Sequence, residues 1–209
     1  MNFLISLILG YIIGSLPTAY LVLKRIKNLD ITTQGTGNVG AMNSFEVTNS
    51  KAIGIVVFIL DFCKGMLPIF ILKILSLNDF SLHSVALIAC VFSHCYNPWL
   101  KLKGGRGLAS AAGGTSIIFP FALGMWLILW VVSYLLKKDI TIANVVASAM
   151  TLILTLTSIS TAIKYAFPKP DSEAILVLFT LGLLLIIISK HTEPLQDLFE
   201  SMKSSIRKK

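Results

Sequence analysis

The chain has few charged residues and few cysteines. Charged residues make up 13% of its 209 residues, about half of the roughly 25% typical of soluble domains, which excludes a soluble domain of ordinary composition. The three cysteines, Cys63, Cys90 and Cys95, form no CxxC pair, which argues against a disulfide framework and against a zinc site. No basic residue precedes the first apolar run, so we expect a retained first helix and not a cleaved signal peptide. Internal repeats are also absent, and we expect a single membrane-embedded domain over residues 1–209.

Most of the sequence consists of long apolar segments. Hydrophobic residues make up 55% of the sequence and the mean hydropathy is +0.82, values typical of integral membrane proteins. A membrane-spanning helix needs about 20 apolar residues, and the segments that approach or exceed this length are 3–23, 52–75, 84–100, 108–136, 140–163 and 174–189. The fourth, at 29 residues, is too long for one crossing and contains Pro120, which breaks a helix. We therefore divide it into helices 108–118 and 120–136.

The predicted fold is an all-α integral membrane protein with about seven transmembrane helices, one of them short or broken. A six-helix count is the alternative. With the N-terminus outside and the C-terminus cytoplasmic, fourteen lysines and arginines lie inside and only Lys73, Lys164 and Lys169 lie outside, as the positive-inside rule requires. The net charge of +8 follows from this asymmetry and from attraction to anionic lipid headgroups. We therefore expect membrane lipids as partners, and no nucleic acid.

Two glycine-rich polar segments interrupt the apolar sequence, at residues 34–43 (QGTGNVGAMN) and 101–107 (KLKGGRG). Glycine lets backbone amides approach an anion closely, and nearby cations strengthen such a site. The first segment contains GxGxxG, but a dinucleotide fingerprint requires a preceding strand, and here a membrane helix precedes it. The predicted phosphate-binding residues are Gly35, Gly37, Asn38, Gly40, Asn43, Lys103, Gly104, Gly105, Arg106 and Gly107. The alternatives are a flexible connector for the first segment and a basic turn that contacts only lipid phosphate for the second.

A few polar residues lie within or beside the apolar segments. Asp61 and Lys64 are three positions apart, share a helix face and can form an ion pair, for which we expect a structural role that supports the first glycine-rich segment. His94 lies near the inner end of the third apolar segment and is either a structural or a catalytic residue. His191 follows the last segment, where it either caps a helix or donates to a phosphate or carbonyl oxygen. The tail 193–202 has apolar residues at helical spacing, which predicts an amphipathic interfacial helix.

In their order along the chain, these segments resemble the bacterial acyl-phosphate:glycerol-3-phosphate acyltransferase family. Residues 35–43 resemble its first motif, GSGNxGATN, and residues 61–65 match its DxxKG motif. Residues 103–110 (KGGRGLAS) are close to its second motif, FKGGKGVAT, and His191 matches the histidine of its third motif, RHxxNIxRL. The resemblance extends over nearly the whole chain.

The resemblance implies transfer of a fatty acyl group from acyl-phosphate to the 1-position of sn-glycerol 3-phosphate. The products are lysophosphatidic acid and phosphate, and the reaction is the first step of phospholipid synthesis. It also implies a place in the inner (cytoplasmic) membrane with the active face toward the cytoplasm. No metal and no cofactor are implied, because acyl-phosphate is already activated and needs mainly proximity and anion stabilisation. Thr36 stands where the family has an essential serine, so Thr36 and His191 are the implied catalytic residues, with Asp61, Lys64 and His94 in support.

The chain departs from the family motifs at several polar positions. The arginine that closes the first motif is Glu46 here, and in the third motif asparagine is replaced by Pro194 and arginine by Asp197. Proline has no N–H to donate, and a carboxylate repels a phosphate by roughly 1 to 4 kcal/mol at about 4 Å. An active enzyme that uses other cations, an enzyme for another acceptor and a catalytically impaired paralogue all fit these changes. A non-enzymatic membrane protein, such as a small transporter or regulator, is the alternative from a different class.

Overall fold

The structure is a computed structural model that describes residues 1–192, 194–196 and 200, and this part of the chain contains helices and no strand. The helices are α1 (Asn2–Gly14), α2 (Thr18–Lys27), α3 (Ala41–Thr48), α4 (Lys51–Ile74), α5 (Phe80–Cys95), α6 (Leu108–Ile118), α7 (Pro120–Lys137), α8 (Ile140–Thr157), α9 (Ile159–Ala162) and α10 (Glu173–Ser189). Three short 3₁₀ helices, η1 (Ile31–Thr33), η2 (Pro98–Leu100) and η3 (Ile163–Tyr165), lie in the connections. The predicted tail helix 193–202 falls mainly outside the described residues, as does Asp197.

The predicted break at Pro120 is confirmed. Helix α6 ends at Ile118 and α7 begins at Pro120, with Phe119 between them. Proline is well tolerated at the first position of a helix, because the first N–H groups of a helix have no partner within it. The 29-residue apolar segment therefore forms two helices, and the predicted helices over 52–75 and 174–189 are likewise found as α4 and α10.

The prediction of one continuous helix over 3–23 is wrong, because the chain leaves the helical conformation between Gly14 and Thr18. Pro17 lacks an N–H and disfavours the helical conformation of the residue before it. Groups on α4 cover this break: the Lys64 Nζ donates to the Leu16 carbonyl at 3.0 Å, and the Thr18 hydroxyl donates to the Asp61 carboxylate. Hydrogen bonds from α4 therefore stabilise the break between α1 and α2.

Two other predicted helices end earlier than expected. Helix α5 begins at residue 80, where the Asp79 carboxylate accepts hydrogen bonds from the amides of Ser81 (2.8 Å) and Leu82 (3.1 Å). It ends at residue 95 instead of 100, ahead of Pro98, which cannot continue a helix hydrogen-bond pattern. The segment 140–163 is divided into α8, α9 and η3.

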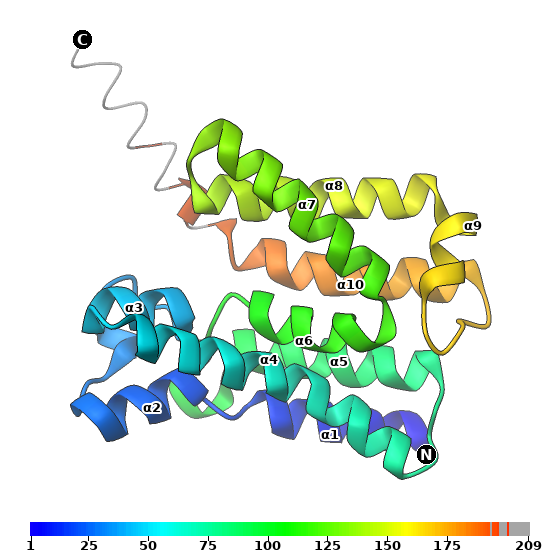
Figure 1. Ribbon diagram of the computed structural model, residues 1–209. Coiled ribbons are helices and arrows are strands. Elements are labelled where there is room, and N and C mark those ends of the chain that lie inside the picture. Colours follow the sequence, from blue (N-terminus) through cyan, green and yellow to red (C-terminus); the bar gives the residue numbers. More distant parts are fainter. Residues whose placement is uncertain (193, 197–199, 201–209) are drawn as a thin grey trace.

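The helices form two groups that lie against each other (Figure 1): α1, α4, α5 and α6 in one, and α7, α8 and α10 in the other. Helices α4 and α6 pack closely through glycines. A Cβ on Gly65 would meet the backbone of Ser110, and a Cβ on Gly113 would meet the backbone of Phe62. Small residues of this kind let helix backbones approach each other in membranes, where apolar burial between helices contributes little.

The outer surface of the molecule is apolar. Four helical segments of the described chain are long and apolar enough to cross a membrane: Asn2–Lys27, Lys51–Ile74, Pro120–Lys137 and Ile140–Thr157. Large apolar side chains such as those of Ile59, Ile128 and Leu178 are exposed, as expected for a surface in contact with lipid. The fold is that of an all-helical integral membrane protein.

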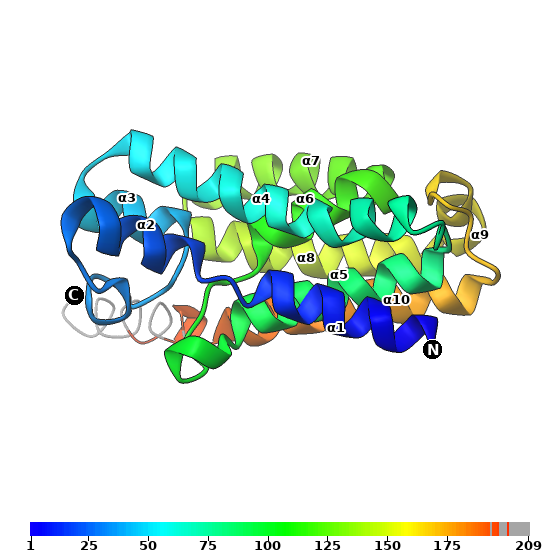
Figure 2. The same ribbon diagram turned by 90° about the horizontal axis from the view of Figure 1, so that it is seen from below.

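Both views place the polar loops at one end of the helix bundle. Helices α2 and α3, the end of α7 and the end of α10 lie at the left, whereas the N-terminus and α9 lie at the right (Figure 2). The glycine-rich segments follow α2 and precede α6, so they belong to the left end.

Candidate functional site

The first glycine-rich segment is shaped by Asn43, in the first turn of α3. The Asn43 side-chain nitrogen donates to the carbonyls of Gln34 (3.1 Å) and Asn38 (2.9 Å), and its oxygen accepts from the Thr36 amide (3.0 Å). Gly35 has a φ of 56°, a conformation that glycine adopts without a Cβ clash. The Asn43 amide is thus engaged within the segment and fixes the shape of the loop.

The second glycine-rich segment is tied to the first and to α5. The Val39 amide donates to the Gly104 carbonyl and the Gly105 amide donates to the His94 carbonyl, both at 3.2 Å. Gly107, with a φ of 82°, comes directly before α6. The two segments that the sequence predicts to bind phosphate therefore form one structural unit.

A buried ionic cluster lies beneath this unit. The Lys64 Nζ is 2.8 Å from the Asp61 Oδ1, which confirms the predicted ion pair, and the His94 Nδ1 is 3.7 Å from the same oxygen. All three side chains are nearly inaccessible to solvent. The carbonyl of His94 holds Gly105, so the cluster is connected directly to the second glycine-rich segment.

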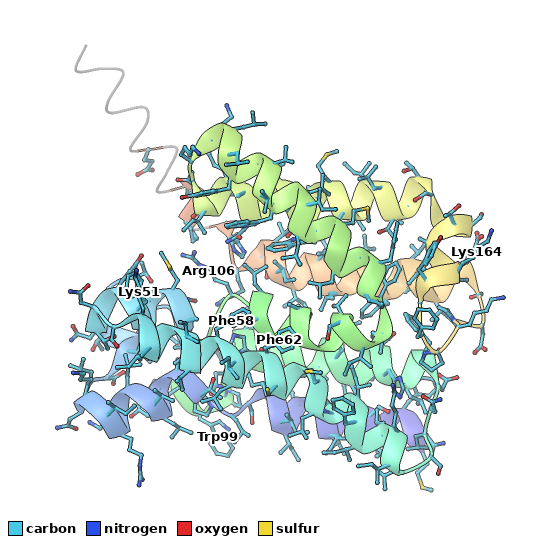
Figure 3. All side chains as sticks on the ribbon, in the orientation of Figure 1. Lys51, Phe58, Phe62, Trp99, Arg106 and Lys164 are labelled. Atoms are coloured by element: carbon cyan, nitrogen blue, oxygen red, sulfur yellow. The ribbon has the colours of Figure 1, made fainter. Side chains whose placement is uncertain are left out.

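A cavity of about 500 Å³ runs from the polar loops into the apolar interior. Its polar lining includes Asn38, Asp61, His94, Arg106 and Asn144, together with three threonines, and its other walls are mainly apolar side chains of α4, α6, α7, α8 and α10. Figure 3 shows Arg106 in the space between the two helix groups, with Phe58 on the neighbouring face of α4. Such a cavity fits an elongated apolar ligand with an anionic head.

The predicted site residues fall into two sets. Asn38, Gly40, Arg106 and Gly107 line the cavity together with Asp61 and His94. The side chains of Thr36 and Lys103 are exposed on the loops, and His191 is buried, with 1% of its surface exposed. The structure therefore brings one set together around the cavity, whereas Thr36, Lys103 and His191 lie outside its lining.

Sequence reasoning missed Asn144 and Trp130, which both line the cavity. The Trp130 Nε1 donates to the Asn144 Oδ1 at 2.7 Å, and the Asn144 Nδ2 is 3.3 Å from the His191 Nε2. The available signal was an asparagine within an apolar segment, since polar groups at membrane depth are costly and commonly functional.

Comparison with known proteins decides the family. A sequence profile of the family described as Glycerol-3-phosphate acyltransferase matches residues 4–201. The chain belongs to this family. The glycerol-3-phosphate acyltransferase of Thermotoga petrophila is 33% identical over 95% of this chain and 94% of its own length. That of Helicobacter acinonychis is 33% identical over 74% of each chain. This protein is accordingly an acyltransferase, and the non-enzymatic alternative is not favoured.

A solved structure supports the same assignment for this acyltransferase. The crystal structure of PlsY (YgiH), an integral membrane glycerol 3-phosphate acyltransferase in its glycerol 3-phosphate form, has a TM-score of 0.78. It is 25% identical, and the match covers 96% of this chain and 94% of that one. The all-helical membrane fold is therefore that of the family.

Among the described residues of the acyltransferase, Arg106 is the only lysine or arginine that lines the cavity. Burial lowers the pKa of the Arg106 guanidinium, and the carboxylate of Glu46 acts in the opposite direction. A guanidinium stays protonated in proteins all the same. The negative charge of Glu46 therefore favours the protonated form of Arg106.

Gly105 has no room for a side chain. A Cβ at this position would meet the imidazole of His94 and lie 2.9 Å from the Val39 carbonyl. We expect Gly105→Ala to displace residues 101–107 and to lower kcat/KM by about 100-fold, the effect of a misplacement of about 1 Å. Acyl transfer by the purified variant measures this. Gly124→Ala is the matched control, since its Cβ meets nothing within 4 Å. Normal kinetics in Gly105→Ala would show that residues 101–107 take no part in the site.

Proposed function

We propose that this acyltransferase takes its acyl group from acyl-phosphate and transfers it to the 1-hydroxyl of sn-glycerol 3-phosphate. The observation that carries the proposal is the cavity, which combines Arg106 and glycine-rich backbone at one end with apolar helix walls along its length. The phosphate of the donor fits the polar end, where guanidinium and backbone N–H groups bind phosphate oxygens strongly. The acyl chain fits the apolar walls.

The reaction itself needs little beyond alignment of the two substrates. The acceptor hydroxyl oxygen forms a bond to the acyl carbon, the bond from that carbon to the phosphate oxygen breaks, and phosphate leaves with the proton of the hydroxyl. Positive charge and N–H groups around the leaving phosphate stabilise the charge that develops on it. No cofactor enters this scheme.

The acceptor approaches from the aqueous side of the loops in our proposal. The exposed side chains of Thr36 and Lys103 are available to a water-soluble glycerol phosphate there. The Thr36 hydroxyl accepts a hydrogen bond from the Asn38 amide at 3.4 Å, a long bond that an acceptor hydroxyl can replace. His191, which is buried, contributes through its neighbour Asn144.

We also propose seven membrane crossings, by α1 with α2, α4, α5, α6, α7, α8 and α10, with the N-terminus outside and the loops cytoplasmic. The alternation of these helices between the two ends of the bundle (Figure 1) supports this count. The fourteen inside lysines and arginines support the orientation. We also propose that the protein lies in the inner membrane of a bacterial cell with its site facing the cytoplasm.

The proposal is tested by turnover of the purified protein in detergent. Palmitoyl-phosphate is supplied with and without glycerol 3-phosphate, and released phosphate and lysophosphatidic acid are measured. Acceptor-dependent phosphate release with formation of lysophosphatidic acid is the expected result. Folded protein that forms no lysophosphatidic acid under these conditions contradicts the proposed pair of substrates.

Glu46 offers a second test, on the acceptor side. Because its carboxylate is close enough to influence Arg106 and repels an approaching phosphate, we expect Glu46→Arg to lower the KM for glycerol 3-phosphate by about 3- to 10-fold. This corresponds to roughly 1 kcal/mol, the low end of the repulsion between charges in a solvated site. Steady-state kinetics with varied acceptor measures it, and Glu46→Gln is expected to give an intermediate KM. An unchanged or higher KM in both variants shows that another part of the loops binds the acceptor.

A further inference from the structure

A chain of hydrogen bonds with a fixed direction connects α7, α8 and the end of α10. The Trp130 Nε1 donates to the Asn144 Oδ1 (2.7 Å), the Asn144 Nδ2 faces the His191 Nε2 (3.3 Å), and the His191 Nδ1 faces the Ile187 carbonyl (2.8 Å). An indole N–H can only donate and a carbonyl can only accept. The chain therefore runs one way, from the indole to the carbonyl.

This direction determines the state of each group between the two ends. Asn144 must present its oxygen to Trp130 and its NH₂ to His191. His191 must accept at Nε2 and donate from Nδ1, so its imidazole is neutral with the proton on Nδ1. Burial lowers the pKa of His191, the hydrogen bond to the Ile187 carbonyl raises it, and the positive charge of Arg106 lowers it. The net shift is downward, which agrees with the neutral form. The ammonium of Lys190, the residue before His191, lies over the aromatic ring of Tyr96.

The residues of this hydrogen-bond chain differ in whether they line the cavity. Asn144 and Trp130 line it together with Arg106, whereas His191 is 1% exposed and is not part of the lining. The NH₂ group of Asn144 carries two hydrogens, and the hydrogen bonds of the described residues use one of them, toward His191. The second N–H has no hydrogen-bond partner among the described residues, and Asn144 itself lines the cavity.

We infer that Asn144 is a substrate-binding residue, whose second amide hydrogen donates to a phosphate oxygen of the acyl donor near Arg106, and that His191 and Trp130 are positioning residues that orient this amide. The inference rests on the proposed function for the identity of the donor. It assigns to His191 an action through Asn144, with no contact between the imidazole and the substrate.

The test compares Asn144→Leu, of similar size but without the amide, with Ser148→Ala. Ser148 is one turn further along α8 and accepts from the Trp126 Nε1 at 3.1 Å, so the control also removes a hydrogen bond between α7 and α8. We expect Asn144→Leu to lower kcat/KM for palmitoyl-phosphate by about 10- to 100-fold, as for loss of a hydrogen bond to a charged group, while the KM for glycerol 3-phosphate changes less than twofold. Ser148→Ala is expected to match the wild type.

A double-mutant cycle with His191→Phe distinguishes action through Asn144 from direct contact. If His191 acts only by orienting the amide, the double variant loses no more than Asn144→Leu alone. Losses that multiply, a normal kcat/KM in Asn144→Leu, or a selective rise in the KM for glycerol 3-phosphate each overturn the inference. Thermal unfolding of each variant shows that it is folded.

Binding of hexadecylphosphonate, which carries an anionic head and an apolar chain but transfers no acyl group, separates this inference from the proposed function. We expect Asn144→Leu to raise its Kd by about tenfold and Ser148→Ala to leave it unchanged. Wild-type protein that binds the phosphonate in this Asn144-dependent way but forms no lysophosphatidic acid contradicts the proposed function alone. Equal binding by wild type and Asn144→Leu contradicts the inference alone.

Discussion

Replacement of Arg106 by methionine is expected to lower kcat/KM for palmitoyl-phosphate by about 100- to 1,000-fold, the usual cost of removing one group that stabilises developing charge. Arg106 is the cation that lines the cavity in the described structure, and it lies where the cavity meets the glycine-rich loops. Methionine preserves much of the length and the apolar stem of arginine but removes its charge and its donors. Initial rates at varied palmitoyl-phosphate concentration measure the loss.

Two further variants locate the origin of this loss. Lys101→Met removes the same charge from the same loop, but the Lys101 side chain is exposed and lies outside the cavity lining, so kcat/KM is expected to change less than threefold. Arg106→Lys restores the charge without the two-pronged geometry of the guanidinium, so a partial recovery is expected. An equal loss in Lys101→Met and Arg106→Met means that the loops act through general attraction of anions to the membrane surface.

Most of the helices could be predicted from the sequence because a bilayer imposes strong constraints. Backbone groups in lipid must be satisfied within the helix, so apolar length alone indicates a helix. Pro120 divides its segment because a proline is stable at a helix start and costly in the interior. The same reasoning applied to Pro17 would have indicated the break between α1 and α2.

Pro17 marks the position of that break, but the contacts that stabilise it come from distant residues. Leu16 and Thr18 find their partners on Lys64 and Asp61 of α4, more than 40 positions away in the sequence. Apolar length within one segment carries no information about such contacts. The ion pair between Asp61 and Lys64 could be predicted, since it is local to one helix, but its second function of holding the break could not.

The candidate site shows the same division between local and long-range information. Glycine-rich segments and basic residues identified the loops, and Arg106 was among them. Asn144 and Trp130 were missed because their importance depends on α7 and α8 packing beside the end of α10. Asn43 was predicted to bind phosphate from its residue type, whereas the structure shows its amide bonded within the loop. Motifs thus indicated which segments lie at the cavity, while packing decides which side chains reach it.

The stability of the protein is expected to depend strongly on Lys64. Its ammonium is 2.8 Å from the Asp61 carboxylate and donates to the Leu16 carbonyl at 3.0 Å, and both charged side chains are buried. Lys64→Met leaves the carboxylate buried with only Thr18 and the more distant His94 beside it. We expect the free energy of unfolding to fall by about 3 to 5 kcal/mol, the usual cost of removing one partner of a buried pair. Unfolding of the detergent-solubilised protein by heat or by denaturing detergent measures this loss.

The double variant Asp61→Asn with Lys64→Met identifies the cause. Without the carboxylate there is no uncompensated buried charge, and replacement of both members of a buried pair is often nearly neutral, so the double variant is expected to recover most of the lost stability. Lys73→Met, at the exposed end of the same helix, is the matched control and should change the free energy by less than about 0.5 kcal/mol. A double variant as unstable as Lys64→Met would show that the Leu16 hydrogen bond at the helix break, and not the ion pair, is the main source of stability. The break between α1 and α2 would then depend on a single ammonium group.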